Sequence, residues 1–398
     1  MFLLCRSPIA LSIRRLRGIV PSPASTLPCI LKSPTFPCSR RCFHVEGIAL
    51  APVVFGGLFV ALWTWKCMMM VVFQNKIIYM PGLPPNARWE RIDDYKSRCG
   101  GVVWREERIR AADGTDLALC VADVDIGQPR RRRHETGPLG EVPQSTDASF
   151  YVLYFQGNAS SIPPRLPDLS SALCMLKRQM HGVPTDVRVT VACLSYRGYW
   201  TSRGRPTEKG IRLDAAAILK WVAQHYDESR AAVSQSPNCQ SAQVILWGQS
   251  IGSGVATNLA AEQSMPERLH LNSLILETPF TSIRAMLQVL YPQKWLPYQY
   301  LWPFLRNQLD SWKNLENIAD NSGAEKSDPH IFILEAAKDE LVPAELSQKL
   351  YDRSIEVGLT VNRKAVSGAF HNDVMFRPEG RKAVSGFIAQ RIAAHSSS

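Results

Sequence analysis

Five residues near the middle of the chain, Gly248 to Gly252, read Gly-Gln-Ser-Ile-Gly and place a serine between two small neighbours. The apolar run 241–247 before them is typical of a buried strand, and the small residues 254–261 after them favour a helix. A sharp turn from strand to helix exposes the serine hydroxyl above a sheet, where it can act as a nucleophile. The sequence therefore predicts that Ser250 is catalytic. An ordinary turn between a strand and a helix is the alternative.

A nucleophilic serine needs a base, and in this motif the histidine base follows both the serine and the acid in the chain. Four of the eight histidines follow Ser250, and three of them, His270, His330 and His371, are weighed as the base. His330 opens an apolar run and fits a strand edge, whereas His270 lies in a polar connection that we expect to be a solvated loop. His371 lies in a loop after the strand-like run 360–366. We predict that His371 is the base, with an ordinary loop histidine as the alternative.

The acid that orients the histidine should lie between the two, on a loop that follows a strand. The run 331–335 has the composition of a strand, and residues 337–343 form the loop after it. Asp339 in this loop is the predicted acid. The alternatives are Glu340, as a solvated neighbour, and Glu335, as a carboxylate at the strand end.

Other elements must position these three side chains. The residues around Asp113-Gly114 predict a β-hairpin between strands at 105–110 and 117–121. We expect central strands at 150–155, 187–194, 244–247, 273–276, 331–334 and 360–366. Helical segments fall between them, and the clearest is 208–225. This alternation predicts an α/β fold with a mostly parallel central sheet and helices on both faces.

Six blocks occur in order along the chain: Tyr154–Ala159, Ser195–Tyr199 with Gly204–Pro206, the turn at Ser250, Glu277–Ser282, Lys338–Pro343 and Phe370–Asp373. Together they resemble the α/β-hydrolases and, more narrowly, the membrane-anchored bud-emergence group of that family. The resemblance covers roughly residues 100–395. It implies an α/β-hydrolase fold with the triad Ser250, Asp339 and His371, in agreement with the chain order.

The chain departs from this family pattern where Gln156-Gly157 replaces the usual His-Gly. The loop at this place offers a backbone N–H to the developing oxyanion, and the residue after the nucleophile offers the second. A backbone donor does not depend on the preceding side chain. We therefore expect Asn158 or Ala159, together with Ile251, to form the oxyanion hole. The alternative for Asn158 is a simple turn residue.

The N-terminal part of the chain has a different composition. Residues 1–45 contain seven arginines or lysines and no acid, as a mitochondrial transit peptide or a disordered basic tail would. The uncharged run 48–65 predicts a transmembrane anchor within 46–74, with Trp63 and Trp65 at the interface, and a buried core helix is the alternative. Residues 75–99 would link this anchor to the hydrolase domain.

These features predict a single-pass membrane protein in the mitochondrion, the endoplasmic reticulum or the plasma membrane. The net charge of +11 is concentrated in residues 1–76, so the catalytic part is nearly neutral and nucleic acid is not an expected partner. Four consecutive arginines, 130–133, lie in a polar surface insertion, either solvated or in contact with lipid headgroups. The ten cysteines contain no Cys-x-x-Cys pair, so we expect reduced thiols without a metal or other cofactor.

The segment from about 280 to 325 is too long and too aromatic for a plain connection. We expect a cap over the site that forms an apolar acyl pocket or faces the bilayer. Trp295, Trp302 and Tyr196 are the expected pocket residues. The alternative is an aromatic helix pair buried in the core.

The sequence predicts a membrane-anchored serine hydrolase that cleaves esters or thioesters with an apolar acyl chain. The expected partners are the lipid bilayer and an acyl lipid or acylated protein, so a lipid esterase and a protein depalmitoylase are both compatible. A serine peptidase of the same fold, or a membrane-tethered scaffold with impaired catalysis, is the alternative.

Overall fold

A computed structural model describes residues 45–127, 148–183, 187–233, 241–262, 265–321 and 329–397. The predicted leader up to residue 44, the four arginines 130–133 and half of the ten cysteines lie outside the described residues.

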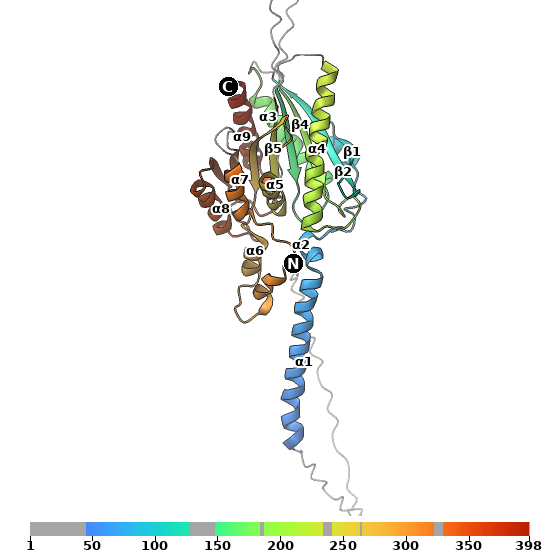
Figure 1. The fold of residues 1–398 in the computed structure, drawn as a ribbon, viewed down its shortest axis with the longest axis vertical. Helices are drawn as coiled ribbons and strands as arrows, with labels where there is room; N and C mark the ends of the chain where they lie inside the picture. Colours follow the sequence, from blue (N-terminus) through green and yellow to red (C-terminus); the bar gives the residue numbers. More distant parts are fainter. Residues whose placement is uncertain are drawn as a thin grey trace, which may run out of the picture. The chain divides into compact units, whose positions relative to one another are not determined.

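Within the described residues, the central sheet has eight strands in the order β1-β2-β4-β3-β5-β6-β7-β8 (Figure 1). Their bounds are β1 Arg105–Arg110, β2 Asp116–Ile126, β3 Ala148–Phe155, β4 Val187–Ser195, β5 Ala242–Gln249, β6 Leu269–Glu277, β7 His330–Ala336 and β8 Val361–Val366. The strands β1 and β2 form the predicted antiparallel hairpin, and β2 also pairs antiparallel with β4. The remaining pairs are parallel, which confirms the mostly parallel sheet.

Two details of the sheet differ from the sequence predictions. His270 lies in β6, not in a solvated loop, because pairing with β5 continues past the apolar run and sets His270 beside Gln243. The strand β8 is an edge strand and not a central one, since it pairs with β7 alone among the described strands. Its alternate half-exposed residues fit that position.

Helices cover both faces of the sheet. Their bounds are α1 Val45–Val72, α2 Gln74–Tyr79, η1 Ile92–Arg98, η2 Pro163–Arg165, α3 Leu166–Gln179, α4 Glu208–Val233, α5 Ile251–Glu262, α6 Ile283–Leu290, η3 Pro297–Phe304, α7 Ser311–Asn321, α8 Ala344–Glu356, η4 Val374–Phe376 and α9 Pro378–Ser397. Here η denotes a 3₁₀ helix. The helix α4 runs eight residues beyond the predicted end at 225.

Alternation of side chains along each strand separates two apolar cores. Leu153 of β3 belongs to the core under α4 and α5, together with Ile218 and Val255. Its neighbour Val152 belongs to the core under α3 and α9, together with Leu169. This division explains why long, nearly continuous apolar strands form the centre of the molecule.

The helix α1 contains one stretch, Leu50–Val72, that is long and apolar enough to cross a membrane by length and composition. Its large apolar side chains are exposed, so it is not the buried core helix of the alternative interpretation. The chain divides into two units at Leu58 within this helix, and residues from Phe59 onward belong to the unit that holds the sheet.

The segment predicted as a cap begins with α6 and η3, which form the cap itself, and ends with α7, which packs against α5 in the body. Prolines at 292, 297 and 303 keep its first two helices short. Trp295, Tyr300, Trp302 and Phe304 are exposed, so the segment is not an aromatic helix pair buried in the core.

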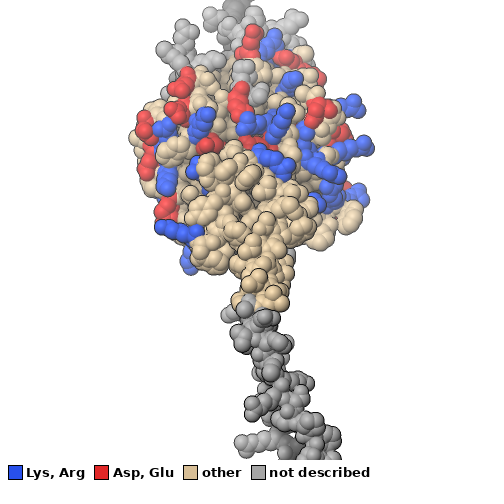
Figure 2. All heavy atoms as spheres, turned by 60° about the horizontal axis from the view of Figure 1, so that its bottom comes forward, with Lys and Arg blue, Asp and Glu red and all other residues tan. Residues whose placement is uncertain are grey.

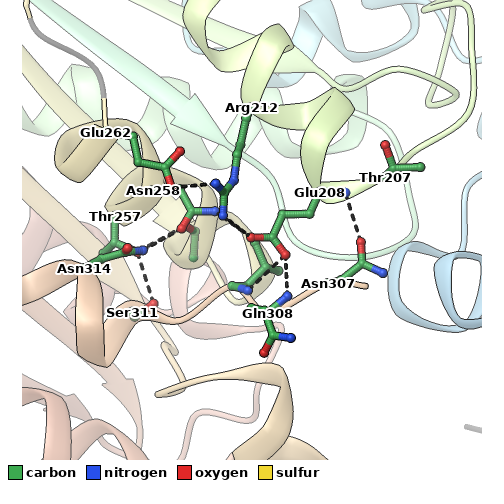
Figure 3. Close-up of polar contacts among 12 residues, drawn as sticks. Thr207, Glu208, Arg212, Thr257, Asn258, Glu262, Asn307, Gln308, Ser311 and Asn314 are labelled. Carbon is green, nitrogen blue, oxygen red and sulfur yellow. Dashed lines mark hydrogen bonds and ion pairs between the residues drawn. The ribbon is translucent and has the colours of Figure 1, made fainter. Parts of the chain in front are cut away.

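A buried carboxylate fixes the return from this cap to the body (Figure 3). Glu208, at the start of α4, is 4% exposed. Its Oε1 accepts hydrogen bonds from Arg212 Nη2 at 2.6 Å and Asn258 Nδ2 at 3.2 Å. Its Oε2 accepts from the backbone N–H groups of Gln308 and Leu309. One side chain therefore joins α4, α5 and the segment that leaves the cap.

Asn307 extends this network towards α2. Its Oδ1 accepts from the backbone N–H of Glu208 at 2.9 Å and from the hydroxyl of Tyr79 at 3.1 Å. Its Nδ2 donates to the side chains of Gln74 and Asn75. The residues just after α1 are thus bonded to the end of the cap.

We predict that Glu208→Ala lowers the free energy of unfolding by about 3 kcal/mol, because it leaves several buried donors without an acceptor. Glu262→Ala is the matched control, since Glu262 also pairs with Arg212 but is a third exposed, and it should cost less than about 1 kcal/mol. Denaturant unfolding in detergent measures both. Equal losses in the two variants would contradict the role of Glu208.

Candidate functional site

Three loops converge at one edge of the sheet. Ser250 follows β5, Asp339 follows β7 and His371 follows β8. Because these strands are parallel, their carboxyl ends meet at the same edge. The topology alone therefore gathers the three predicted side chains.

The backbone at Ser250 adopts a left-handed conformation, with φ of 52°. A residue other than glycine rarely takes this conformation, and it persists only where its surroundings enforce it. A Cβ at Gly248 would lie 2.2 Å from the carbonyl oxygen of Gly252, and one at Gly252 would lie 2.1 Å from that of Phe155. Both positions therefore require glycine. The Gly-Gln-Ser-Ile-Gly pattern is needed because the tight turn leaves no room for a Cβ at either end.

The side chains of the three residues form a continuous chain of hydrogen bonds. His371 Nε2 lies 3.0 Å from Ser250 Oγ. His371 Nδ1 lies 2.8 Å from Asp339 Oδ2 and 3.0 Å from Oδ1. Ser250 is 7% exposed and His371 is 2% exposed, so water has little access to these bonds. In such an arrangement a histidine can accept the proton of a serine while the carboxylate fixes the orientation of the ring.

The loop after β7 holds Asp339 by its own backbone. Asp339 Oδ1 accepts from the N–H groups of Leu341 at 2.9 Å and Val342 at 2.8 Å. Glu340 is more than a solvated neighbour, because its Oε2 accepts from the backbone N–H of His371 at 3.0 Å. Glu335 is held in an ion pair with Arg363 on β8. The structure thus brings Asp339, and neither glutamate, to the imidazole ring.

The loop 156–160 runs beside Ser250. A Cβ added to Gly157 would lie 3.6 Å from the Cβ of Ser250. Among the expected oxyanion donors, Ala159 is already engaged, since its N–H donates to the carbonyl of Tyr79 at 3.0 Å. No backbone partner occurs within the described residues for the N–H groups of Asn158 and Ile251. Within the described part of the chain, Asn158 and Ile251 therefore keep backbone donors that an oxyanion could use, whereas Ala159 does not.

Gln156 is buried in this loop. Its Nε2 lies 3.5 Å from the carbonyl of Ala159, and its Oε1 has no partner among the described residues. Its backbone carbonyl accepts from the hydroxyl of Tyr196 at 2.9 Å. Burial raises the pKa of Tyr196 well above its usual value, so the phenol stays protonated and can donate.

The last residue of α2 and the residues that follow it, 79–83, form a strap across the same loop. The carbonyl of Tyr79 accepts from Ala159 N–H and from the hydroxyl of Tyr199. The carbonyl of Leu83 accepts from Ser160 N–H. No sequence pattern indicates these backbone contacts, because the bonded groups lie 80 and 77 positions apart.

A buried ion pair supports the turn at Ser250. The side chain of Glu277 pairs with Arg165, and Trp247 Nε1 donates to it at 3.1 Å. The backbone carbonyl of Glu277 accepts from the N–H of Ser250 at 2.8 Å. Glu277 lies in one of the six sequence blocks, but nothing in the sequence indicated Arg165 as its partner.

Arg165 also connects this pair to its surroundings. Its Nε donates to the hydroxyl of Tyr154, which donates in turn to Gln249 Oε1 at 3.0 Å. Burial raises the pKa of nearby Asp168 to about 6, and its Oδ2 has no partner among the described residues. Gln249, the residue before Ser250, is therefore held by Tyr154, and Tyr154 is held in turn by Arg165.

The three expected pocket residues lie elsewhere. Tyr196 is completely buried and contacts the loop at Gln156, so it cannot touch a substrate in this conformation. Trp295 and Trp302 lie on the surface, 75% and 43% exposed. Sequence composition identified the aromatic segment but could not show which way its side chains face.

Among the described residues there is no group of three or more His, Cys, Asp or Glu side chains that could hold a metal ion.

Comparison with known proteins places this arrangement in a family, although no family model matches the chain. The uncharacterized protein Rv2307c of Mycobacterium tuberculosis is 30% identical over 334 residues, covering 84% of this chain and 90% of that protein. Protein bem46 of Schizosaccharomyces pombe is 25% identical over 63% of this chain and 70% of its own length. The lysophosphatidylserine lipase ABHD12 of Danio rerio is 30% identical over 52% of this chain and 51% of its length.

A solved structure shares the fold. The α/β-hydrolase of Vibrio vulnificus aligns with a TM-score of 0.51 and 17% identity, covering 81% of this chain and 92% of that one. The sheet order, the tight turn at Ser250 and these relatives agree with one another. The chain therefore belongs to the α/β-hydrolase family, in the bud-emergence group that includes bem46.

Proposed function

We propose that this protein is a membrane-anchored serine hydrolase that cleaves carboxylic esters or thioesters of an apolar acyl group. The observation that carries the proposal is the 3.0 Å approach of His371 Nε2 to Ser250 Oγ, with Asp339 on the opposite ring nitrogen. Membership of a family of hydrolases supports it.

In the proposed mechanism Ser250 Oγ attacks the carbonyl carbon while His371 Nε2 takes the hydroxyl proton. The tetrahedral intermediate collapses when the imidazolium returns that proton to the leaving alcohol or thiol, and an acyl-enzyme remains. Water then gives a proton to His371 and attacks the acyl carbon, which releases the acid and restores Ser250. Asp339 holds the ring in the required tautomer and stabilises the imidazolium in each half of the cycle.

The oxyanion of each intermediate would accept hydrogen bonds from the backbone N–H groups of Ile251 and Asn158. Ile251 follows the nucleophile at the start of α5, where helix N–H groups have no partner within the helix. Asn158 follows Gly157, which lies beside Ser250. Gln156 contributes only backbone to this proposal, so its substitution for histidine leaves the donor set intact.

The substrate class rests on two features of the chain. One relative, of which the match covers about half the length, is named a lysophosphatidylserine lipase. Lysophosphatidylserine carries an acyl ester. The apolar helix Leu50–Val72 would hold the enzyme at a bilayer, where acyl lipids and acylated proteins are both concentrated. A lipid esterase and a protein depalmitoylase share this acyl chemistry.

The anchor is proposed as a single span within residues 46–74, and the hydrolase domain as residues 100–395. The basic leader 1–45 is compatible with a mitochondrial address, whereas the endoplasmic reticulum and the plasma membrane remain open if it is a tail.

We predict that Ser250→Ala abolishes labelling by a fluorophosphonate and that His371→Ala and Asp339→Asn each lower kcat by on the order of 10³ or more. The two losses should not add, because both residues act through Ser250. Gel-based labelling and ester hydrolysis measure these effects.

Ser354→Ala is the matched control, since this buried hydroxyl donates to the backbone carbonyl of Leu350 within α8 and not to any of the three site residues. It should label normally. Undiminished labelling of Ser250→Ala would remove Ser250 from the mechanism, and failure of the wild-type chain to label would favour a scaffold over an enzyme.

A second prediction concerns the loop beside the nucleophile. Tyr196→Phe removes the hydrogen bond to the carbonyl of Gln156, so kcat should fall about tenfold with little change in KM, a fraction of the loss of a whole oxyanion donor. Tyr151→Phe loses a hydroxyl that contacts His225 instead, and it should keep normal kcat. Equal effects on melting temperature and on kcat in both variants would show a merely structural role.

A third prediction concerns the acyl chain. Each additional buried methylene should contribute roughly 0.8 kcal/mol, about a factor of four in kcat/KM, until the acyl site is full. Rates on a series of p-nitrophenyl esters should therefore rise from acetate towards medium chains. A profile that falls from acetate onward would contradict an apolar acyl substrate and leave a hydrolase of small esters.

A further inference from the structure

One surface of the hydrolase unit is unusually apolar. Residues 290–304, which we term the aromatic segment, expose Leu290, Trp295, Tyr300, Trp302 and Phe304. Phe73 and Ile77 are also exposed, and they flank Gln74 and Asn75, which are bonded to residues at or just beyond the end of this segment. Soluble proteins rarely expose so many large apolar side chains close together, and such patches mark interaction sites.

Contacts fix the aromatic segment to the end of α1. Gln74 Nε2 donates to the carbonyl of Phe304 at 3.1 Å, and the backbone N–H of Arg306 donates to Gln74 Oε1 at 2.7 Å. The guanidinium of Arg306 donates to the carbonyls of Val71 and Val72, the last two residues of the helix.

A second contact lies further back along the helix. The ammonium group of Lys66 is 5.0 Å from the centre of the Tyr298 ring. The aromatic segment is thus bound along the last two turns of α1, with Glu208 and Asn307 holding its far end to the body.

The two segments that form this surface carry only basic charges. Residues 278–309 contain three basic residues, Arg284, Lys294 and Arg306, and no acidic residue. Residues 47–89 likewise contain Lys66, Lys76 and Arg88 without an acid. Figure 2 is turned to bring the lower end of Figure 1 forward and shows a broad area there without acidic or basic side chains. Cations beside apolar and aromatic groups match the headgroup region of a bilayer.

The length of the helix sets the depth of this surface. A hydrocarbon core of about 30 Å takes roughly 20 helical residues. Counted from Leu50, the apolar stretch therefore reaches the far boundary of the core near its last turn, at about Met69. Lys66, Val71 and Gln74 lie near this boundary of the hydrocarbon core. Tyr298, Arg306 and Phe304, which contact them, therefore lie near it as well.

We propose that the aromatic segment is a second membrane contact, which rests in the bilayer interface beside the anchor. This inference rests on the anchoring part of the proposed function and not on its chemistry. Trp295 and Trp302 would lie among the headgroups and upper acyl chains. The guanidinium of Arg284 lies 3.9 Å from the centre of the Trp302 ring. Arg284 and Lys294 would then lie near lipid phosphates. The active-site edge of the sheet would then face the surface that supplies acyl chains, because the cap follows β6 at that edge.

The test uses the full-length protein in vesicles of phosphatidylcholine and phosphatidylglycerol, with or without lipids brominated in the upper acyl chain. Subtracting the fluorescence of Trp295→Phe from that of wild type isolates the emission of Trp295. We expect brominated lipid to quench this emission by about half or more, and aqueous acrylamide to quench it weakly. Because Trp295 is largely exposed, the variant should keep its fold, which near-ultraviolet circular dichroism checks.

Trp312→Phe is the matched control, since Trp312 lies on α7 beside Arg353 and outside the aromatic segment. Its emission should respond to acrylamide and not to brominated lipid. The same response from Trp295 would overturn the proposal. Protection of Trp295 from both quenchers would also overturn it, in favour of a second protein copy covering this surface.

The outcome is independent of hydrolysis, because no substrate is added. Alkaline carbonate extraction of the same vesicles tests the anchor separately. Extraction of the protein together with lipid quenching of Trp295 would support the second contact while rejecting the span.

Discussion

The left-handed backbone at Ser250 is the constraint on which the other features of the site depend. It orients the hydroxyl towards His371, and it requires glycine at two flanking positions, because any side chain there would collide with neighbouring backbone. Strain of this kind costs on the order of 1–3 kcal/mol and persists only under compensating contacts. The carbonyl of Glu277, held by the pair with Arg165, supplies one of them. The stability of the sheet edge and the geometry of the site therefore have a common support.

The same edge collects contacts from distant parts of the chain. Tyr79 and Leu83 bond to the loop beside Ser250, while Asn307 joins Tyr79 to Glu208 and to the end of the cap. The linker expected at 75–99 is accordingly not a free tether at its beginning. Its first residues bond to the loop 156–160, so they help to hold the backbone beside Ser250.

Local patterns were enough to predict the fold. The alternation of strands and helices, the tight turn and the order of serine, acid and histidine are properties of short windows, and the sheet and the convergence of the three loops follow from them. The catalytic roles remain predictions. What the sequence did not indicate depends on contacts between distant segments. The burial of Tyr196, the support of Glu277 by Arg165 and the capture of Ala159 N–H by Tyr79 each join residues between 40 and 112 positions apart. The orientation of Trp295 belongs to the same class, since composition cannot distinguish a pocket wall from an outer surface.

The strap from Tyr79 to Leu83 has a consequence for how rates should be expressed. A catalytic unit on a long flexible tether samples a volume, and its encounters with substrate depend on concentration in solution. Here the loop beside Ser250 is bonded to Tyr79 and Leu83, which lie 7 and 11 positions after the last residue of α1. If that helix lies in a bilayer and Ser250 is the proposed nucleophile, Ser250 keeps a nearly constant height above the bilayer and meets its substrates by diffusion in two dimensions. The natural variable for its kinetics is then the mole fraction of substrate in the surface, and dilution of the bulk lipid at fixed composition should leave turnover unchanged.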